Sequence, residues 1–160
     1  MNRAFLVALG GALIVVAAAV LWWMEQAGPD NVAVHIDPND AELVAIGERI
    51  YAQQCASCHG ADLEGQADWR KRKSDGRMPA PPHDATGHTW HHDDATLFAV
   101  TKFGPQAVAG PNYESDMLVY SDVLSDPEIR AVLAYIKSTW PAEIRSRQAA
   151  ISQRAKGNGS

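Results

Sequence analysis

The chain has 160 residues, which is room for one domain with accessory segments. Its 14 basic and 19 acidic residues give a formal net charge of −5, and this balance argues against a nucleic-acid-binding protein. The two cysteines, Cys55 and Cys58, belong to one short motif, so the chain offers no disulfide framework to stabilise a small domain. A bound cofactor would supply part of the core.

Residues 1–24 predict a membrane anchor. Residues 4–24 carry no charge, and a helix of that length would span roughly 31 Å, about the hydrocarbon core of a bilayer. Arg3 before this segment and Glu25 after it place the N-terminus in the cytoplasm and the following chain in the periplasm, at a bacterial inner membrane. A cleaved secretory signal is the alternative, since residues 17–19 are all alanine. The following chain is exported in both cases.

The segment between the anchor and the cysteine motif divides into a linker and a helix. Residues 25–38 are polar with glycine and proline, which predicts a periplasmic linker containing at most a short edge strand at residues 32–36. Asn39 is a plausible cap for a helix that leads directly to the cysteine motif. Gly47 lowers the helix propensity of that segment, so it is either tolerated or required by close packing.

The motif Cys55-Ala56-Ser57-Cys58-His59 is typical of covalent attachment of a c-type haem. Two cysteines three positions apart lie on the same side of one helical turn, so both thiols can add to the two vinyl groups of one flat ring. The imidazole of the next residue then binds the iron. The pattern therefore predicts haem thioethers at Cys55 and Cys58 and an iron ligand at His59.

Three other interpretations of the cysteine pair remain open. A redox disulfide would be expected next to a strand, whereas a helix is predicted before Cys55. A structural disulfide across two residues would constrain little chain and add little stability. A zinc site would need two further ligands. Four histidines could supply them: His83, His88, His91 and His92.

Beyond the motif, the chain alternates between long loops and capped helices. Residues 61–90 have no regular period and predict an ordered loop around a cofactor. Asp93 or Asp94 caps a short helix that Gly104 ends, and a second loop, which contains Met117, follows. Ser125 and Glu128 form a capping box for the next helix. Residues 142–155 predict a surface helix, and residues 156–160 predict a disordered end.

Two polar clusters in the long loop have no assigned role. The histidine group, which consists of His83, His88, His91 and His92, has three possible roles. It could pack or hydrogen-bond near the haem propionates, bind a second metal such as copper, or supply the distal ligand of the iron. The basic cluster could dock an acidic redox partner or simply be solvated. This cluster consists of Arg70, Lys71, Arg72, Lys73 and Arg77.

From residue 39 to residue 140 the sequence resembles the class I cytochromes c, and more narrowly a group of membrane-anchored bacterial monohaem cytochromes. The resemblance rests on the capped helix before Cys-X-X-Cys-His, the wrapping loop with Met78-Pro79-Ala80-Pro81-Pro82, the isolated Met117 and the final helix ending in Trp140-Pro141. It implies an all-α fold of three to five helices around one haem c. It also implies that the first and last helices cross, with Gly47 and Tyr51 against Val132 and Tyr135.

The resemblance also implies the iron ligands. His59 is the proximal ligand and Met117 the distal ligand, with Met78 as a rival that is not a ligand in similar sequences. The second ring nitrogen of His59 is expected to donate to a proline carbonyl of the loop, and Pro79 is the first choice. A thioether opposite an imidazole favours reduced iron.

Together these features predict an electron carrier and not an enzyme, either as a separate protein or as a subunit of an oxidoreductase complex. Its domains are an anchor (1–24), a periplasmic linker (25–38), a haem domain (39–141) and a partly helical tail (142–160). Its partners would be a quinol-oxidising complex, a terminal oxidase or another periplasmic redox enzyme, and the membrane itself through the N-terminal helix. The alternative is a haem- or copper-dependent enzyme, sensor or metal-handling protein that uses the histidines of residues 83–92.

Overall fold

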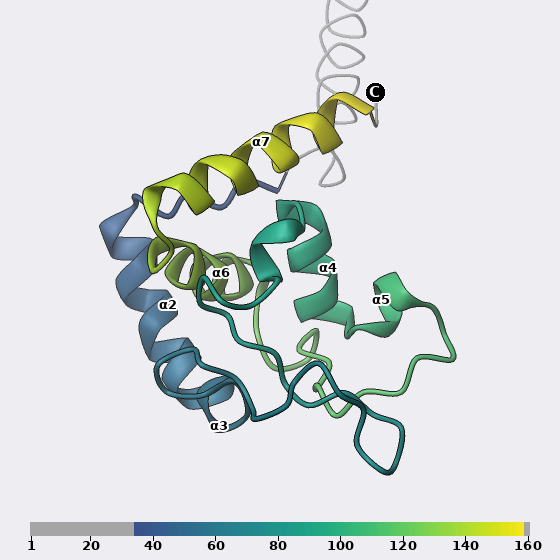
Figure 1. Cartoon of the computed structure of the whole chain (residues 1–160). Helices are drawn as coiled ribbons and strands as arrows, with labels where there is room; N and C mark the ends of the chain where they lie inside the picture. Colours follow the sequence, from purple (N-terminus) through teal and green to yellow (C-terminus); the bar gives the residue numbers. More distant parts are fainter. Residues whose placement is uncertain (1–33, 159–160) are drawn as a thin grey trace, which may run out of the picture. The chain divides into compact units, whose positions relative to one another are not determined.

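Two helices from opposite ends of the described chain, α2 (Ala41–Gln54) and α6 (Asp126–Ser138), cross and form the centre of the fold (Figure 1). The computed structural model describes residues 34–158, and the predicted anchor lies outside this range. Every regular element of residues 34–158 is helical, which confirms an all-α fold for this part of the chain. The remaining elements are α3 (Ala56–His59), the 3-10 helix η2 (Thr89–His91), α4 (Asp94–Phe103), α5 (Gln106–Ala109) and α7 (Ala142–Asn158).

Gly47 lies where α2 and α6 touch. A Cβ atom at this position would stand 1.9 Å from the carbonyl oxygen of Ala131 and 2.9 Å from Cβ of Tyr135. One turn further along α2, the rings of Tyr51 and Tyr135 are 5.4 Å apart. The predicted crossing is therefore confirmed, with Ala131 rather than Val132 facing Gly47. Gly47 is required because the two backbones approach too closely for a side chain.

The helix caps explain where the elements begin. Asp40, and not the predicted Asn39, caps α2, because its carboxylate accepts from the backbone N–H groups of Glu42 and Leu43 at 3.1 and 3.0 Å. Asp93 caps α4, as one of the two expected alternatives. The predicted capping box of α6 is present, since the Glu128 carboxylate accepts from both the backbone N–H and the hydroxyl of Ser125. These caps satisfy N–H groups that have no partner inside a helix.

Helix α7 packs on the rest of the domain through polar side chains. Gln148 is fully buried, and its Nε2 donates to the Asp94 carboxylate at 2.7 Å. Asp94 also pairs with the buried Lys137 at 2.7 Å, and Lys137 donates to the carbonyl of Ile36 at 2.9 Å. The described end of the predicted linker is thus part of the folded domain, and Ile36 is only 1% exposed. Helix α7 continues to Asn158, past the expected start of disorder at residue 156.

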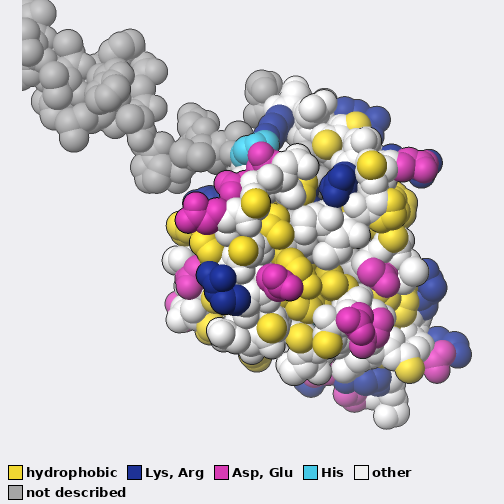
Figure 2. Space-filling view, turned by 90° about the vertical axis from the view of Figure 1, so that its left-hand side faces the viewer, with side chains coloured by type: hydrophobic (Ala, Val, Ile, Leu, Met, Phe, Trp, Pro, Cys, Tyr) yellow, Lys and Arg dark blue, Asp and Glu magenta, His cyan; other side chains and the backbone are white. Residues whose placement is uncertain are grey.

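The face of the molecule on the left of Figure 1 shows acidic and basic side chains interspersed around hydrophobic ones (Figure 2). No continuous basic surface covers this face. Among residues 34–158, no helix combines the length and the apolar character needed to cross a bilayer. No strand forms at Val34–Ile36, the described part of the predicted edge strand.

Candidate functional site

The cysteine motif lies at the junction of α2 and α3. Cys55 ends α2 and begins α3, and its carbonyl accepts from the N–H groups of Cys58 and His59 at 3.1 and 2.9 Å. This single helical turn puts Cys55 and Cys58 on the same side of the helix, as their spacing predicts. Both thiols are free, with Cys58 exposed and Cys55 partly buried.

The surroundings of Cys55 do not favour redox disulfide chemistry. Burial, followed by the neighbouring Cys58, raises the pKa of the Cys55 thiol to about 11. A redox-active cysteine needs a lowered pKa, because the thiolate is the nucleophile. The surroundings of Cys55 therefore do not lower its pKa as a redox-active thiol would require.

His59 is buried and held in one orientation. It is 8% exposed, and its Nδ1 lies 2.9 Å from the carbonyl oxygen of Pro81. A carbonyl can only accept, so Nδ1 carries the proton and the lone pair of Nε2 remains available for a metal. Burial lowers the pKa of His59, which keeps the imidazole neutral, as metal binding requires.

The prediction of Pro79 as the carbonyl partner of His59 is wrong, and Pro81 takes this place. The reason lies in the register of the loop. Gly65, whose N–H donates to the carbonyl of His59 at 2.7 Å, packs so closely on the Pro81–Pro82 peptide that a Cβ would stand 2.4 Å from the Pro82 nitrogen. This contact holds Pro81 beside His59, whereas Pro79 lies two residues earlier in the chain.

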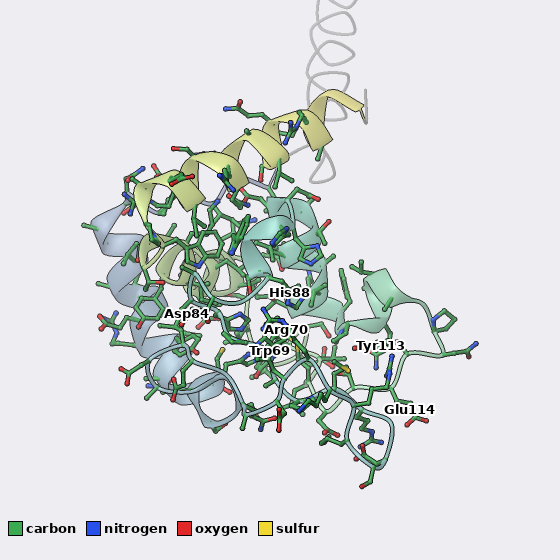
Figure 3. All side chains as sticks on the ribbon, in the orientation of Figure 1. Trp69, Arg70, Asp84, His88, Tyr113 and Glu114 are labelled. Atoms are coloured by element: carbon green, nitrogen blue, oxygen red, sulfur yellow. The ribbon has the colours of Figure 1, made fainter. Side chains whose placement is uncertain are left out.

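Of the four histidines of residues 83–92, His88 and His92 meet edge-on with ring centroids 5.6 Å apart, whereas His83 and His91 contact other rings. His83 stacks on His59, with ring centroids 3.9 Å apart. His88 stacks on Trp69, which also carries the Arg70 guanidinium, and these three lie together in Figure 3. His91 stacks on Trp90 instead. Within residues 34–158 no group of three or more histidine, cysteine or acidic side chains could hold a metal ion. The zinc and copper interpretations therefore have no geometric support there.

The loop that contains Met117 is tied to the long loop by ion pairs. Asp116, the residue before Met117, pairs with Lys73 and also with Arg77, in the latter case at 2.7 Å. Met117 is partly buried and packs against the core. The far end of its loop is held by Tyr120, whose hydroxyl donates to the carbonyl of Gln54 at 2.7 Å. These ion pairs could not be predicted from local sequence patterns, because their partners are about forty positions apart.

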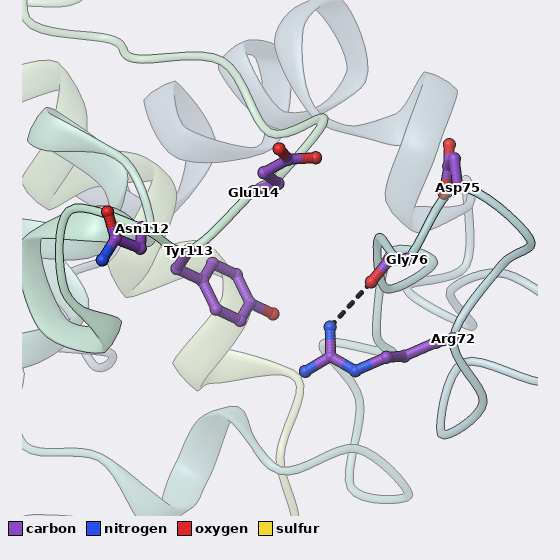
Figure 4. Close-up of a pocket in the computed structure, with 6 residues that line it drawn as sticks. All are labelled: Arg72, Asp75, Gly76, Asn112, Tyr113 and Glu114. Carbon is purple, nitrogen blue, oxygen red and sulfur yellow. Dashed lines mark hydrogen bonds between the residues drawn. The ribbon is translucent and has the colours of Figure 1, made fainter.

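The basic cluster finds its partners within the molecule. Lys71 pairs with Asp68 at 2.8 Å, and Arg72 donates to the carbonyl of Gly76 at 2.7 Å (Figure 4). A pocket of about 270 Å³ lies beside Arg72 between the two loops. Its lining comprises Arg72, Asp75, Gly76, Asn112, Tyr113 and Glu114. Lys71 and Arg72 are thus held within the long loop, whereas Lys73 and Arg77 join this loop to the Met117 loop through Asp116.

Comparison with known proteins adds the family to this geometry. The sequence model of the cytochrome c family matches residues 44–140. The chain belongs to the cytochrome c family. This cytochrome c is 30% identical over 122 residues to a protein named cbb3-type cytochrome c oxidase subunit CcoP, of Rhodobacter capsulatus. The match covers 72% of the chain and 37% of that relative, so the chain spans little more than a third of its length. No solved structure gives a significant match.

Membership of the family means that the cofactor is haem c, covalently bound. The residues of the motif fit this group, because two free thiols and a neutral imidazole stand on one short helix. Only Nε2 of the His59 imidazole is available to bind the iron, since Nδ1 is already hydrogen-bonded to the Pro81 carbonyl.

Proposed function

We propose that this cytochrome c carries single electrons in the periplasm, with thioethers at Cys55 and Cys58 and with His59 and Met117 as the two iron ligands. The observation that carries the proposal is His59 itself, buried directly after the two thiols with its Nδ1 bonded to Pro81. Haem c supplies a ferric and ferrous couple that gains and loses one electron. If His59 and Met117 both bind the iron, the haem would exchange electrons with partner proteins without a substrate binding at the iron.

The side chains around the haem set the conditions for this transfer. The Pro81 carbonyl fixes the His59 ring and increases the electron density on Nε2. A thioether from Met117 is a soft, uncharged ligand, which favours the ferrous state. Burial disfavours the additional charge of the ferric state as well, so the expected midpoint potential is positive.

The proposed partner is a terminal oxidase, supplied with electrons by a quinol-oxidising complex or another periplasmic redox enzyme. Similarity to the R. capsulatus oxidase subunit supports this choice. An N-terminal anchor at residues 4–24 would hold the haem domain at the bacterial inner membrane. Confinement to the membrane surface raises the effective concentration of the carrier at its partners.

Optical spectra of the full-length protein with its haem test the ligand assignment. The oxidised protein is expected to show the weak far-red band of sulfur-to-iron ligation, and Met117→Ala is expected to abolish it. Met78→Ala is the matched control, since Met78 is also a partly buried methionine in a loop, and it should leave the band unchanged. Loss of the band in Met78→Ala but not in Met117→Ala would overturn the assignment.

A further inference from the structure

His83 differs from the three other histidines of its loop, because its ring lies on that of His59. The two ring centroids are 3.9 Å apart and the planes are inclined by only 20°, which is a parallel stack. Tyr51 approaches the same His83 ring edge-on at 6.3 Å. His83 is thus part of the wall that positions the His59 imidazole.

Three hydrogen bonds hold His83 in this position. Its backbone N–H donates to the carbonyl of Leu63 at 2.8 Å, and its carbonyl accepts from Nε1 of Trp140 at 2.7 Å. Its ring Nδ1 is 2.9 Å from the hydroxyl of Thr89. That hydroxyl donates to the Pro82 carbonyl at 3.4 Å, so its oxygen accepts the Nδ1 proton of His83. The ring therefore cannot rotate away from His59 without breaking this bond.

We propose that His83 is a positioning residue for the iron ligand His59, and that its aromatic face stabilises the positive charge on the His59 ring in the ferric protein. This inference rests on the proposed function, because it takes His59 as the ligand. Pro81 holds one edge of the His59 ring and His83 covers its face, so together they fix both the tilt and the rotation of the ring.

The electrostatic part of the proposal follows from the charge distribution of aromatic rings. The face of such a ring is electron-rich and attracts positive charge. Ferric iron withdraws more electron density from its imidazole ligand than ferrous iron does, so the His59 ring is more positive in the oxidised protein. A stacked aromatic face thus stabilises the ferric state selectively. Its removal should raise the midpoint potential.

Three substitutions of His83 separate the effect of its aromatic face from the effect of its hydrogen bond to Thr89. His83→Phe keeps the face and loses the bond, His83→Gln keeps a polar group without the face, and His83→Leu loses both. In full-length protein with haem, redox titration should give the wild-type potential for His83→Phe and a raised potential for the other two. The ferric electron paramagnetic resonance spectrum should broaden in those two variants, because Pro81 alone then holds the His59 ring and the ring can adopt a wider range of tilts. His91→Leu is the control, since His91 stacks on Trp90.

The outcomes distinguish this inference from the proposed function. Wild-type protein without the far-red band, or with high-spin iron, would contradict the proposed ligands before any His83 variant is considered. With the band present, an unchanged potential in His83→Leu, or equal shifts in His83→Phe and His83→Leu, would overturn the role of His83. If His83→Leu does not retain haem, the comparison of His83→Phe with His83→Gln decides, and equal potentials would overturn it.

Discussion

Asp94 and Asp116 each bind basic side chains, but in opposite surroundings. The side chains of Asp94 and its partner Lys137 are both 6% exposed. The side chain of Asp116 is 47% exposed, and its partners Lys73 and Arg77 are 38% and 41% exposed. The first group joins α4, α6 and α7, whereas the second joins two loops beside Met117.

The difference in exposure gives the two groups different tasks. A buried ion pair has lost its hydration, so removal of one partner leaves an uncompensated charge in the core. An exposed pair is screened by water and salt, and its loss changes the folding free energy little. The α7 end of the domain is therefore held rigidly. The Met117 loop is held by contacts that can loosen without unfolding the protein.

The largest effect is expected for Lys137→Met, which leaves the Asp94 carboxylate buried without its cation. We expect a loss of about 3–5 kcal/mol in the free energy of unfolding, the usual cost of breaking a buried ion pair. Denaturant unfolding followed by circular dichroism measures this loss. Lys102→Met is the control, because the Lys102–Asp126 pair is more exposed, at 25% and 46%. Similar losses in both variants would contradict a special role for the buried pair.

A smaller effect is expected for Gln148→Leu. This substitution removes the bonds from Nε2 to the Asp94 carboxylate, the His92 carbonyl and the Ser152 hydroxyl, and it leaves the bond from Lys137 to Asp94 in place. Loss of one buried donor to a charged group should cost ~1–2 kcal/mol. The same unfolding measurement tests this, with Gln153→Leu on an exposed position of α7 as its control. An unchanged stability would mean that α7 is held by its other contacts.

Asp116→Asn should affect the haem ligand rather than the fold. It removes the charge that attracts Lys73 and Arg77, so the Met117 loop loses its ties to the long loop. We expect a weaker far-red band with an unchanged denaturation midpoint, and 1 M salt should weaken the band of the wild type in the same direction because it screens exposed pairs. Glu114→Gln, which loses only a 3.7 Å contact to Arg77, should change the band less. A parallel loss of stability and band would show that the loop is not independent of the fold.

The smallest effect concerns pH. Hydrogen bonds from Lys73 and Arg77 lower the pKa of Asp116, and Asp116 in turn raises the pKa of Lys73 and of Arg77. For a carboxylate with a lowered folded pKa, the stabilisation is complete above its unfolded pKa and is lost as the pH falls through the folded value. Between about pH 5 and 9 no partner changes charge. The difference in band intensity between wild type and Asp116→Asn should therefore be constant over this range, and a steady drift would contradict the assignment.

The sequence predicted those features that depend on local patterns. The cap of α4, the capping box of α6 and the cysteine motif are each encoded within a few residues, and all three were confirmed as local structure. The position of the loop prolines relative to His59 is not determined by the neighbouring sequence. Pro79 and Pro81 look equivalent in the sequence, and only the contact of Gly65 with the Pro81–Pro82 peptide decides between them.

Long-range polar contacts were likewise outside the reach of the sequence. Nothing in the spacing of the histidines separates His83 from His88, because their stacking partners His59 and Trp69 come from distant parts of the chain. His91 stacks on its own neighbour, Trp90. The buried face of helix α7 carries the polar residues Gln148 and Ser152, so the pattern of apolar residues does not identify this face. The assignment of Met117 as distal ligand stays a prediction, for which the far-red band is the test.

The close contact of Gly47 with Ala131 has a consequence for the order of folding. These residues lie near the two ends of the domain, so their contact closes a chain segment that includes both loops. Closing a long segment costs entropy before any contact compensates for it, and folds that depend on such contacts form slowly. Docking of α2 on α6 is thus expected to limit the folding rate, whereas each helix forms quickly by itself. Stopped-flow refolding should then be slowed by Gly47→Ala far more than by a substitution within the Met117 loop.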